Sequence, residues 1–274
     1  LLFHKGTELG QREMDILSAF FIKSVSVESA LEDDFIKDEN VRQTEIIPPI
    51  YEEYYRLFCL IKRAFPIAAK NMDRFPIGEI HNQLLQCLKH INSYDILTFS
   101  RPSMRTVHYY YHNSILVSLT AFKLAIWAGF AKEDLIPIAL GGLLHDIGNA
   151  KMDRKILYKE DSLTDEERKK IERHTVEGYQ LLKRLSELNE GTRLVALQHH
   201  EKNDGTGYPL GVTSQKIHPY AKVVAVADIY HAMTSNRTYK NAESPYVVLE
   251  HLVESSASKL EPKLVELFIR KAGK

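Results

Sequence analysis

Histidines and acidic residues able to bind metal gather in one part of the chain. Among the 12 histidines, those with acidic or glycine-rich neighbours lie between residues 108 and 200. His145 and Asp146 are adjacent in LLHDIG, at the end of an apolar run that predicts a buried helix. An imidazole and a carboxylate there can reach one ion while the helix body stays in the core. An isolated His-Asp pair is weak evidence, so the interpretation depends on the residues that follow.

Three further histidines lie at the ends of predicted helices. His174 is near the start of one helix, in HTVEG, where a solvated histidine is the ordinary alternative. His199 and His200 close a predicted helix over residues 193–200, because the glycine-rich stretch after them cannot continue it. Adjacent side chains on a helix diverge by about 100°, so two consecutive ligands fit best at a fraying helix end.

A carboxylate and two cations complete the candidate set. Asp228 lies within the apolar run KVVAVADIY, where burial of its charge requires a partner or a metal ion. A helix cap or a buried hydrogen bond is the structural alternative for this residue. Arg237 and Lys240, in TSNRTYK, form a short basic patch that in isolation is typical of a solvated surface.

The elements that must position these residues are predicted to be mainly helical. From Tyr51 onward apolar residues recur at helical spacing, with interruptions expected at Pro66 and at a turn over residues 75–78. Thr164 followed by Glu167 predicts a capping box in front of a helix over residues 168–185.

The beginning of the chain differs from the rest in pattern. Residues 6–28 combine a short amphipathic stretch with a strand-like alternation, and residues 28–50 are charge-rich and contain Pro48-Pro49. The expected organisation is a small α/β N-terminal module with linker over residues 1–50, a helical connecting region over residues 51–104, and the main domain over residues 105–274.

Charge and hydropathy exclude some functions. Lys plus Arg and Asp plus Glu both number 36, so no net positive field would hold a DNA or RNA polymer. No apolar stretch approaches the roughly 20 residues of a membrane-spanning helix, and a cytoplasmic protein is expected. Cys59 and Cys87, the two cysteines, are expected to be buried free thiols.

Four motifs in order, LLHDIG, HTVEG, HHEKNDGTGYP and VADIYHAMTSNRTYK, closely resemble the HD-GYP domain, over about residues 105–274. This family is an all-helical branch of the HD phosphohydrolases. The resemblance implies a bacterial signalling enzyme that hydrolyses cyclic di-GMP to pGpG, GMP or both. It also implies cyclic di-GMP as ligand and a diguanylate cyclase domain as a candidate partner.

The same resemblance implies a binuclear metal centre. Asp146 would bridge two divalent ions, one of them held by His145 and Asp228 and the other by three histidines. Those three are His174, His199 and His200. Iron is the metal the family favours, with manganese as the alternative, and a bridging hydroxide would attack the phosphodiester in line.

Substrate contacts are implied in the last two motifs. Tyr208 of the Gly-Tyr-Pro loop would border the nucleotide, and Arg237 and Lys240 match the phosphate and guanine contacts of the family. A guanidinium suits either a phosphate or a guanine edge, which gives a chain without net charge a local anion site.

The chain departs from the family beside the HD motif. The family signature continues as HDIGK, whereas Asn149 stands at the lysine position here. Lys151, two residues on, could reach back toward the scissile phosphate, and it is the candidate replacement cation. His231 stands where a second acid often follows the motif aspartate.

A second departure affects a metal ligand on the preceding helix. Counting back without a gap places Asn113, rather than a histidine, at the ligand position, with His112 adjacent. Three outcomes are open: His112 takes the role through a helix bulge, Asn113 ligates weakly through its amide oxygen, or that ion is lost. His112 is the first choice. Tyr109 or His108 replaces the carboxylate associated with a third ion, so two ions are expected.

Three functions compete. The first is an active cyclic di-GMP phosphodiesterase, with Asp146 and Lys151 as the candidate catalytic residues. The second is a catalytically weak or inactive receptor of the same fold, binding the dinucleotide or a partner protein, which the asparagines at positions 113 and 149 favour. The third is an HD hydrolase acting on another nucleotide, which the Gly-Tyr-Pro motif disfavours.

Overall fold

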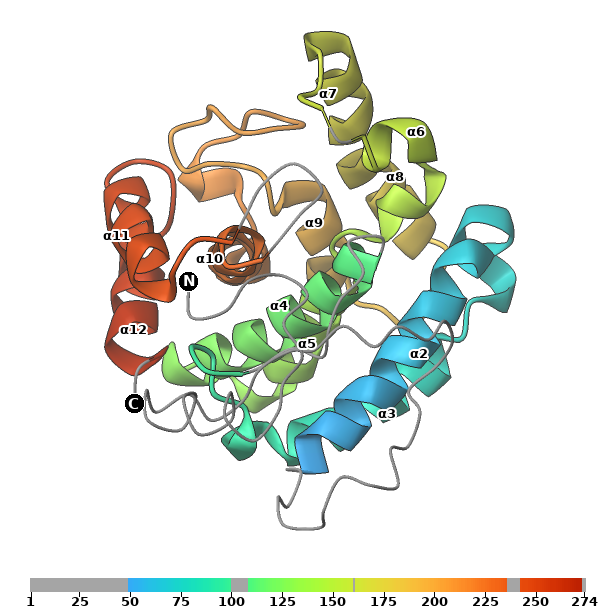
Figure 1. The fold of residues 1–274 in the computed structure, drawn as a ribbon, viewed down its shortest axis with the longest axis horizontal. Coiled ribbons are helices and arrows are strands. Elements are labelled where there is room, and N and C mark those ends of the chain that lie inside the picture. Colours follow the sequence, from blue (N-terminus) through green and yellow to red (C-terminus); the bar gives the residue numbers. More distant parts are fainter. Residues whose placement is uncertain (1–48, 100–107, 160, 236–241, 273–274) are drawn as a thin grey trace, which may run out of the picture. The chain divides into compact units, whose positions relative to one another are not determined.

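The computed structural model describes residues 49–99, 108–159, 161–235 and 242–272, and this part of the chain is helical without a named strand. The longer helices surround a shared core (Figure 1). In chain order the elements are α2 (Pro49–Lys70), η1 (Met72–Arg74), α3 (Ile77–Lys89), η2 (Ile91–Ser93), α4 (Tyr109–Trp127), α5 (Lys132–Leu144), η4 (Ile147–Lys151), α6 (Arg154–Leu157), α7 (Asp165–Glu172), α8 (His174–Leu182), α9 (Glu190–Gln198), η5 (Ser214–Lys216), α10 (Pro219–Met233), α11 (Pro245–Ser256) and α12 (Pro262–Ala272).

The helices α4, α5 and α10 form the centre of this unit. They are apolar on nearly every face, as expected for helices enclosed by others. α4 packs along α5, and α9 and α10 complete the packing around them. Ser118 donates a hydrogen bond to the Ala139 carbonyl at 2.7 Å, where α4 and α5 approach closely. The predicted mainly helical fold is therefore confirmed for the described residues.

α2 runs through Pro66, where an interruption was expected. It ends at Lys70, and η1 with the residues up to Pro76 forms the break before α3. Proline removes one backbone hydrogen bond from a helix. Phe65 and Ala68, on either side of Pro66, are both buried, and this packing favours the continuous helix.

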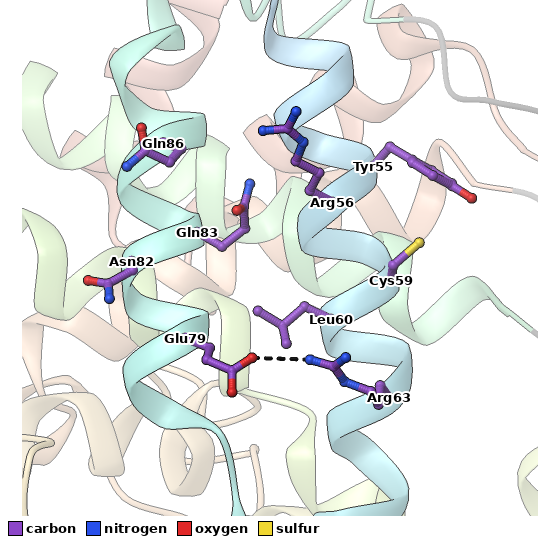
Figure 2. Close-up of a pocket in the computed structure, with 9 residues that line it drawn as sticks. All are labelled: Tyr55, Arg56, Cys59, Leu60, Arg63, Glu79, Asn82, Gln83 and Gln86. Atoms are coloured by element: carbon purple, nitrogen blue, oxygen red, sulfur yellow. Dashed lines mark hydrogen bonds and ion pairs between the residues drawn. The ribbon is translucent and has the colours of Figure 1, made fainter.

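A groove lies between α2 and α3, on the face of α2 that carries polar side chains (Figure 2). Arg63 pairs with Glu79 across it at 3.1 Å. Cys59 is exposed beside the groove, so the expectation of two buried thiols holds for Cys87 alone. The register of α2 explains the difference, because Cys59 points away from the buried face formed by Leu57 and Ile61.

The capping box at Thr164 and Glu167 is confirmed, but the helix it begins is shorter than predicted. α7 ends at Glu172 and α8 begins at His174. At the break, the His174 ring nitrogen Nδ1 lies 2.7 Å from the Ile171 carbonyl. The same carbonyl also accepts the backbone N–H of Arg173, which caps α7. The break therefore also fixes the His174 ring.

The main unit comprises residues 45–99 and 105–274, so α2 and α3 pack in the same compact unit as the later helices. No helix in the described ranges has the length and apolar character needed to cross a bilayer. The predicted N-terminal α/β module, and Arg237 and Lys240, lie outside the described residues.

Candidate metal centre

His145 and Asp146 lie where α5 gives way to η4. The His145 Nδ1 atom is 2.7 Å from the Gly142 carbonyl, so this nitrogen carries the proton and donates it. Nε2 then faces two carboxylates, 3.5 Å from Asp146 Oδ2 and 3.4 Å from Asp228 Oδ1. This Nε2 atom is buried and has no hydrogen-bond partner within the described part of the chain.

The His174 and His199 rings are oriented in the same way, at the start of α8 and the end of α9. His199 Nδ1 lies 3.0 Å from the Val195 carbonyl, one turn back on its own helix. The Nε2 atoms of the two rings approach each other at 3.4 Å. His174 Nε2 is 3.2 Å, and His199 Nε2 3.8 Å, from Asp146 Oδ1. Backbone carbonyls thus fix Nε2 as the inward-facing nitrogen of these rings.

The donor atoms form two overlapping groups, each with its atoms within 4.8 Å of one another. The first, which we call subsite 1, contains Asp146, His174, His199 and His200. The second, subsite 2, contains His145, His199 and Asp228. The structure thus brings together six of the seven predicted metal ligands.

These groups perturb one another strongly. Burial would lower the pKa of His145, but the charges of Asp146 and Asp228 raise it to about 9. Burial would raise the pKa of both carboxyls, yet the adjacent histidines hold each pKa well below its usual range. Burial and neighbouring imidazoles depress the pKa of His199. The directions of these shifts favour a protonated His145 between ionised Asp146 and Asp228 in the metal-free chain.

Asn113 faces subsite 2 from α4. Its Nδ2 donates a hydrogen bond to Asp228 Oδ1 at 3.1 Å, the same oxygen that lies near His145. Asn113 is buried, and its Oδ1 atom has no hydrogen-bond partner among the described residues. This asparagine thus stands where the resemblance expects a ligand, with its donor end toward the carboxylate.

His112, the predicted seventh ligand, belongs to neither donor group in the described chain. The Tyr54 hydroxyl lies 2.7 Å from His112 Nδ1, and the ring stacks on Phe58 with centroids 4.2 Å apart. Both partners come from α2. The ring is thus held among aromatic side chains, which favours the alternative that Asn113 occupies the ligand position.

The lysine that the family has directly after HDIG is replaced here by Asn149. Asn149 is buried within η4, and its Oδ1 atom has no hydrogen-bond partner among the described residues. Lys151, the candidate replacement, is 40% exposed and lies 3.3 Å from Glu177 on α8. His231, at the position of the second acid, is buried with Nε2 2.7 Å from Thr120 Oγ1.

The Gly-Tyr-Pro loop covers the histidines. The Tyr208 and His200 rings lie 4.8 Å apart, between centroids. Burial, with the charges of Asp146 and Asp228, raises the pKa of Tyr208, so its hydroxyl stays protonated. A side chain at Gly207 would meet the backbone of residues 200–202, with its Cβ 2.5 Å from the His200 carbonyl oxygen. Only glycine fits this close approach.

Sequence reasoning missed Glu201, which organises the same loop. Its buried carboxylate accepts hydrogen bonds from the backbone amides of Leu210 at 2.6 Å and Val212 at 3.1 Å. The available signal was its place directly after two histidines and before a glycine-rich loop, because an acid there can satisfy the amides of the turn.

The donor set fits divalent transition metal ions. Imidazole and carboxylate ligands suit iron, manganese and zinc. The buried Nε2 of His145 supports this fit, because it faces the carboxylates of Asp146 and Asp228 at 3.5 and 3.4 Å, an arrangement that suits a shared ion. The carbonyl bonds to Nδ1 provide the ring orientation that metal-bound histidines require.

Comparisons with known proteins place this geometry in context. The profile of the family described as HD domain matches residues 101–264. The cyclic di-GMP phosphodiesterase response regulator RpfG of Xanthomonas campestris is 34% identical over 143 residues, which is 52% of this chain and 38% of that protein. The 3'3'-cGAMP-specific phosphodiesterase 2 of Vibrio cholerae is 31% identical over 154 residues, which is 56% and 30%. The chain thus spans less than half the length of these relatives.

A solved structure resembles this fold over most of its length. Bd1817, an HDG"Y"P protein from Bdellovibrio bacteriovorus, is similar with a TM-score of 0.55 and 17% identity. The match covers 84% of this chain and 73% of that one. It therefore extends the similarity in fold beyond the residues matched by the family profile.

Proposed function

The chain belongs to the HD domain family, of the HD-GYP type, and on that basis we propose that it hydrolyses cyclic di-GMP to pGpG, GMP or both. The observation that carries the proposal is the convergence of the His145, His174 and His199 Nε2 atoms on Asp146. The relatives named as cyclic dinucleotide phosphodiesterases support the choice of substrate.

In this proposal, subsite 1 and subsite 2 would each hold one divalent ion, and Asp146, whose two oxygens face His174 and His145, would serve both. Iron is the proposed metal and manganese the alternative, since both accept imidazole and carboxylate together. Bound ions would polarise the phosphodiester and activate the attacking water. The chain fixes the ligands beforehand, through the carbonyl bonds to the His145, His174 and His199 rings.

The remaining residues of the proposal bind the dinucleotide. Tyr208 keeps its proton because of its raised pKa, so its hydroxyl can donate a hydrogen bond to a phosphate oxygen. Arg237 and Lys240 are proposed as phosphate and guanine contacts on the strength of their motif. We assign no ligand role to His112, which lies outside both donor groups of the described residues, and no substrate role to Lys151, which pairs with Glu177.

A receptor of the same fold is the second candidate. Asn113 presents an amide to Asp228 where the resemblance implies a further imidazole ligand, and one ligand fewer favours weak ion binding at subsite 2. Such a chain would bind cyclic di-GMP, or a diguanylate cyclase domain, without turnover.

Turnover by the metal-loaded protein tests these candidates. The chain is loaded with Fe(II) or Mn(II) without oxygen, incubated with cyclic di-GMP or 3'3'-cGAMP, and the products are separated by chromatography. Linear product that disappears in Asp146→Asn but persists in Asp153→Asn, a matched exposed control, supports the enzyme. Tight binding without turnover under either metal supports the receptor, and neither binding nor turnover contradicts both.

A further inference from the structure

The contact between α2 and α4 involves His112, the residue before Asn113, which contacts Asp228 of subsite 2. Tyr54 and His112 are both buried, with relative exposures of 1% and 5%, and join at 2.7 Å through the tyrosine hydroxyl and Nδ1. The Phe58 ring lies on the His112 ring at an angle of 18°. α2 precedes the region matched by the HD domain profile, so this contact joins an added helix to the family domain.

Asn113, which directly follows His112 in the sequence, is the residue that contacts Asp228. Adjacent side chains on a helix point about 100° apart, so a rotation of α4 that seats His112 against α2 also fixes the direction of Asn113. That direction leads to Asp228 Oδ1, 3.1 Å from the amide nitrogen. The contact of His112 with α2 and the contact of Asn113 with Asp228 therefore depend on the same rotation of α4.

The Asp228 carboxylate depends on this arrangement. Its Oδ1 atom receives the Asn113 amide and lies 3.4 Å from His145 Nε2, so both neighbours fix how the carboxylate faces subsite 2. A turn of α4 would withdraw the amide and leave a buried carboxylate oxygen with fewer partners. The His145, His174 and His199 rings differ from Asp228, because carbonyls near them in sequence orient them.

We propose that Tyr54 and His112 are positioning residues for subsite 2, and that their hydrogen bond holds α4 at the rotation where Asn113 orients Asp228. The inference rests on the proposed function, since it assigns a role within the same metal centre. In this way α2 contributes to the ion affinity of subsite 2.

The first test replaces Tyr54 by phenylalanine, which removes the hydroxyl and keeps the ring. Full-length, metal-free protein is titrated with Mn(II), and the free ion is counted by electron paramagnetic resonance. We expect the dissociation constant at subsite 2 to rise about tenfold, as for other residues that orient a ligand, and that at subsite 1 to stay constant. With cyclic di-GMP, kcat should fall and KM should change little.

A control removes another tyrosine hydroxyl, which is partly buried. Tyr220 lies in the first turn of α10, the helix of Asp228, and its hydroxyl donates a hydrogen bond to Asp134. Tyr220→Phe should lower the melting temperature and leave both ion affinities at the wild-type values. A general loss of stability in Tyr54→Phe would affect both subsites, whereas a positioning role affects subsite 2.

Variants of His112 complete the test. His112→Gln keeps an acceptor for the tyrosine hydroxyl and should retain more affinity at subsite 2 than His112→Phe. The effects of Tyr54→Phe and His112→Phe should not add in the double variant, because both break one bond. Additive effects would show that the two side chains do not act through their shared hydrogen bond and would overturn the inference.

Two results separate this inference from the proposed function. Wild-type affinities in Tyr54→Phe, with two ions bound and substrate hydrolysed, would overturn the positioning role alone. Failure of the wild-type chain to bind Mn(II) or to hydrolyse cyclic di-GMP would contradict the proposed function as well.

Discussion

Subsites 1 and 2 share the ligand His199 and differ in what orients their carboxylate ligands. The His174 ring of subsite 1, the His145 ring of subsite 2 and the shared His199 ring are each held by a backbone carbonyl three or four residues earlier. In subsite 2, Asp228 is oriented by Asn113, from a helix more than 100 residues earlier in the chain. Local hydrogen bonds follow directly from sequence, whereas the second arrangement depends on how α2, α4 and α10 pack. We therefore expect ion affinity at subsite 1 to be insensitive to changes in this helix packing, and ion affinity at subsite 2 to be sensitive to them. We call subsite 1 the robust half and subsite 2 the adjustable half.

The largest effect should come from Asp146, which contacts both halves. Asp146→Asn removes the negative charge between the histidines, so both ions should bind weakly. Turnover of cyclic di-GMP should fall by about 10³-fold or more, because the electrostatic contribution of the ions amounts to several kcal/mol. Metal content after desalting measures this directly. Retention of one tight ion would show that the subsites are independent and break the comparison.

Asp228→Asn should separate the halves. It removes the carboxylate that is near His145 and leaves every member of subsite 1 in place. One tightly bound ion should remain, and kcat should fall by about 10²-fold because ligand orientation at subsite 2 is lost. Loss of both ions in a Mn(II) titration would contradict the division into a robust and an adjustable half.

Asn113→His should raise the ion affinity of subsite 2. The amide nitrogen of Asn113 lies 3.1 Å from Asp228 Oδ1, so an imidazole at this buried position would add a neutral ligand to subsite 2. Affinity for the second ion should rise about tenfold, within the range seen when ligand surroundings change. Asn113→Ala serves as the comparison, since it removes the amide without adding a ligand and should lower the affinity. Equal behaviour of the two variants would show that position 113 does not affect the ion.

The pH dependence offers a smaller, graded test. The pKa of His145 is raised to about 9 in the metal-free chain, so its stabilising interaction with the carboxylates is complete below its ordinary value of 6.5. This contribution is lost as pH rises through about 9, and the melting temperature of the metal-free chain should decline across that window. An ion at subsite 2 must displace the His145 proton, so its affinity should rise up to about tenfold per pH unit below 9.

His199 provides the contrast within the same experiment. Its pKa lies well below 6.5, so an ion that binds His199 displaces no proton from it at neutral pH. Calorimetry in buffers of different ionisation enthalpy should therefore detect one proton, released from His145, when an ion binds at subsite 2. Affinities that do not change between pH 6.5 and 9 would contradict the protonated state of His145.

The features predicted from sequence are those with local causes. The capping box at Thr164 depends on residues three apart, and the structure confirms it. The gathering of His145, Asp146 and His174 followed from family motifs whose order and spacing carry information about the fold, and the structure places them together. Their role as ligands stays a prediction.

The features that sequence could not supply depend on distant partners. The choice between His112 and Asn113 rests on one helix rotation, which Tyr54 helps set from 58 residues away. The continuation of α2 through Pro66 reflects burial of its neighbours. The role of Glu201 likewise depends on distant positions, because its carboxylate accepts the backbone amides of Leu210 and Val212.

The central claim, that the two subsites are unequal, is tested most directly by a Mn(II) titration of the metal-free, full-length wild-type chain without oxygen. Free Mn(II) is counted by electron paramagnetic resonance at each addition. The account predicts two bound ions, with dissociation constants that differ by about tenfold or more. Two ions of equal affinity, or none, would contradict it.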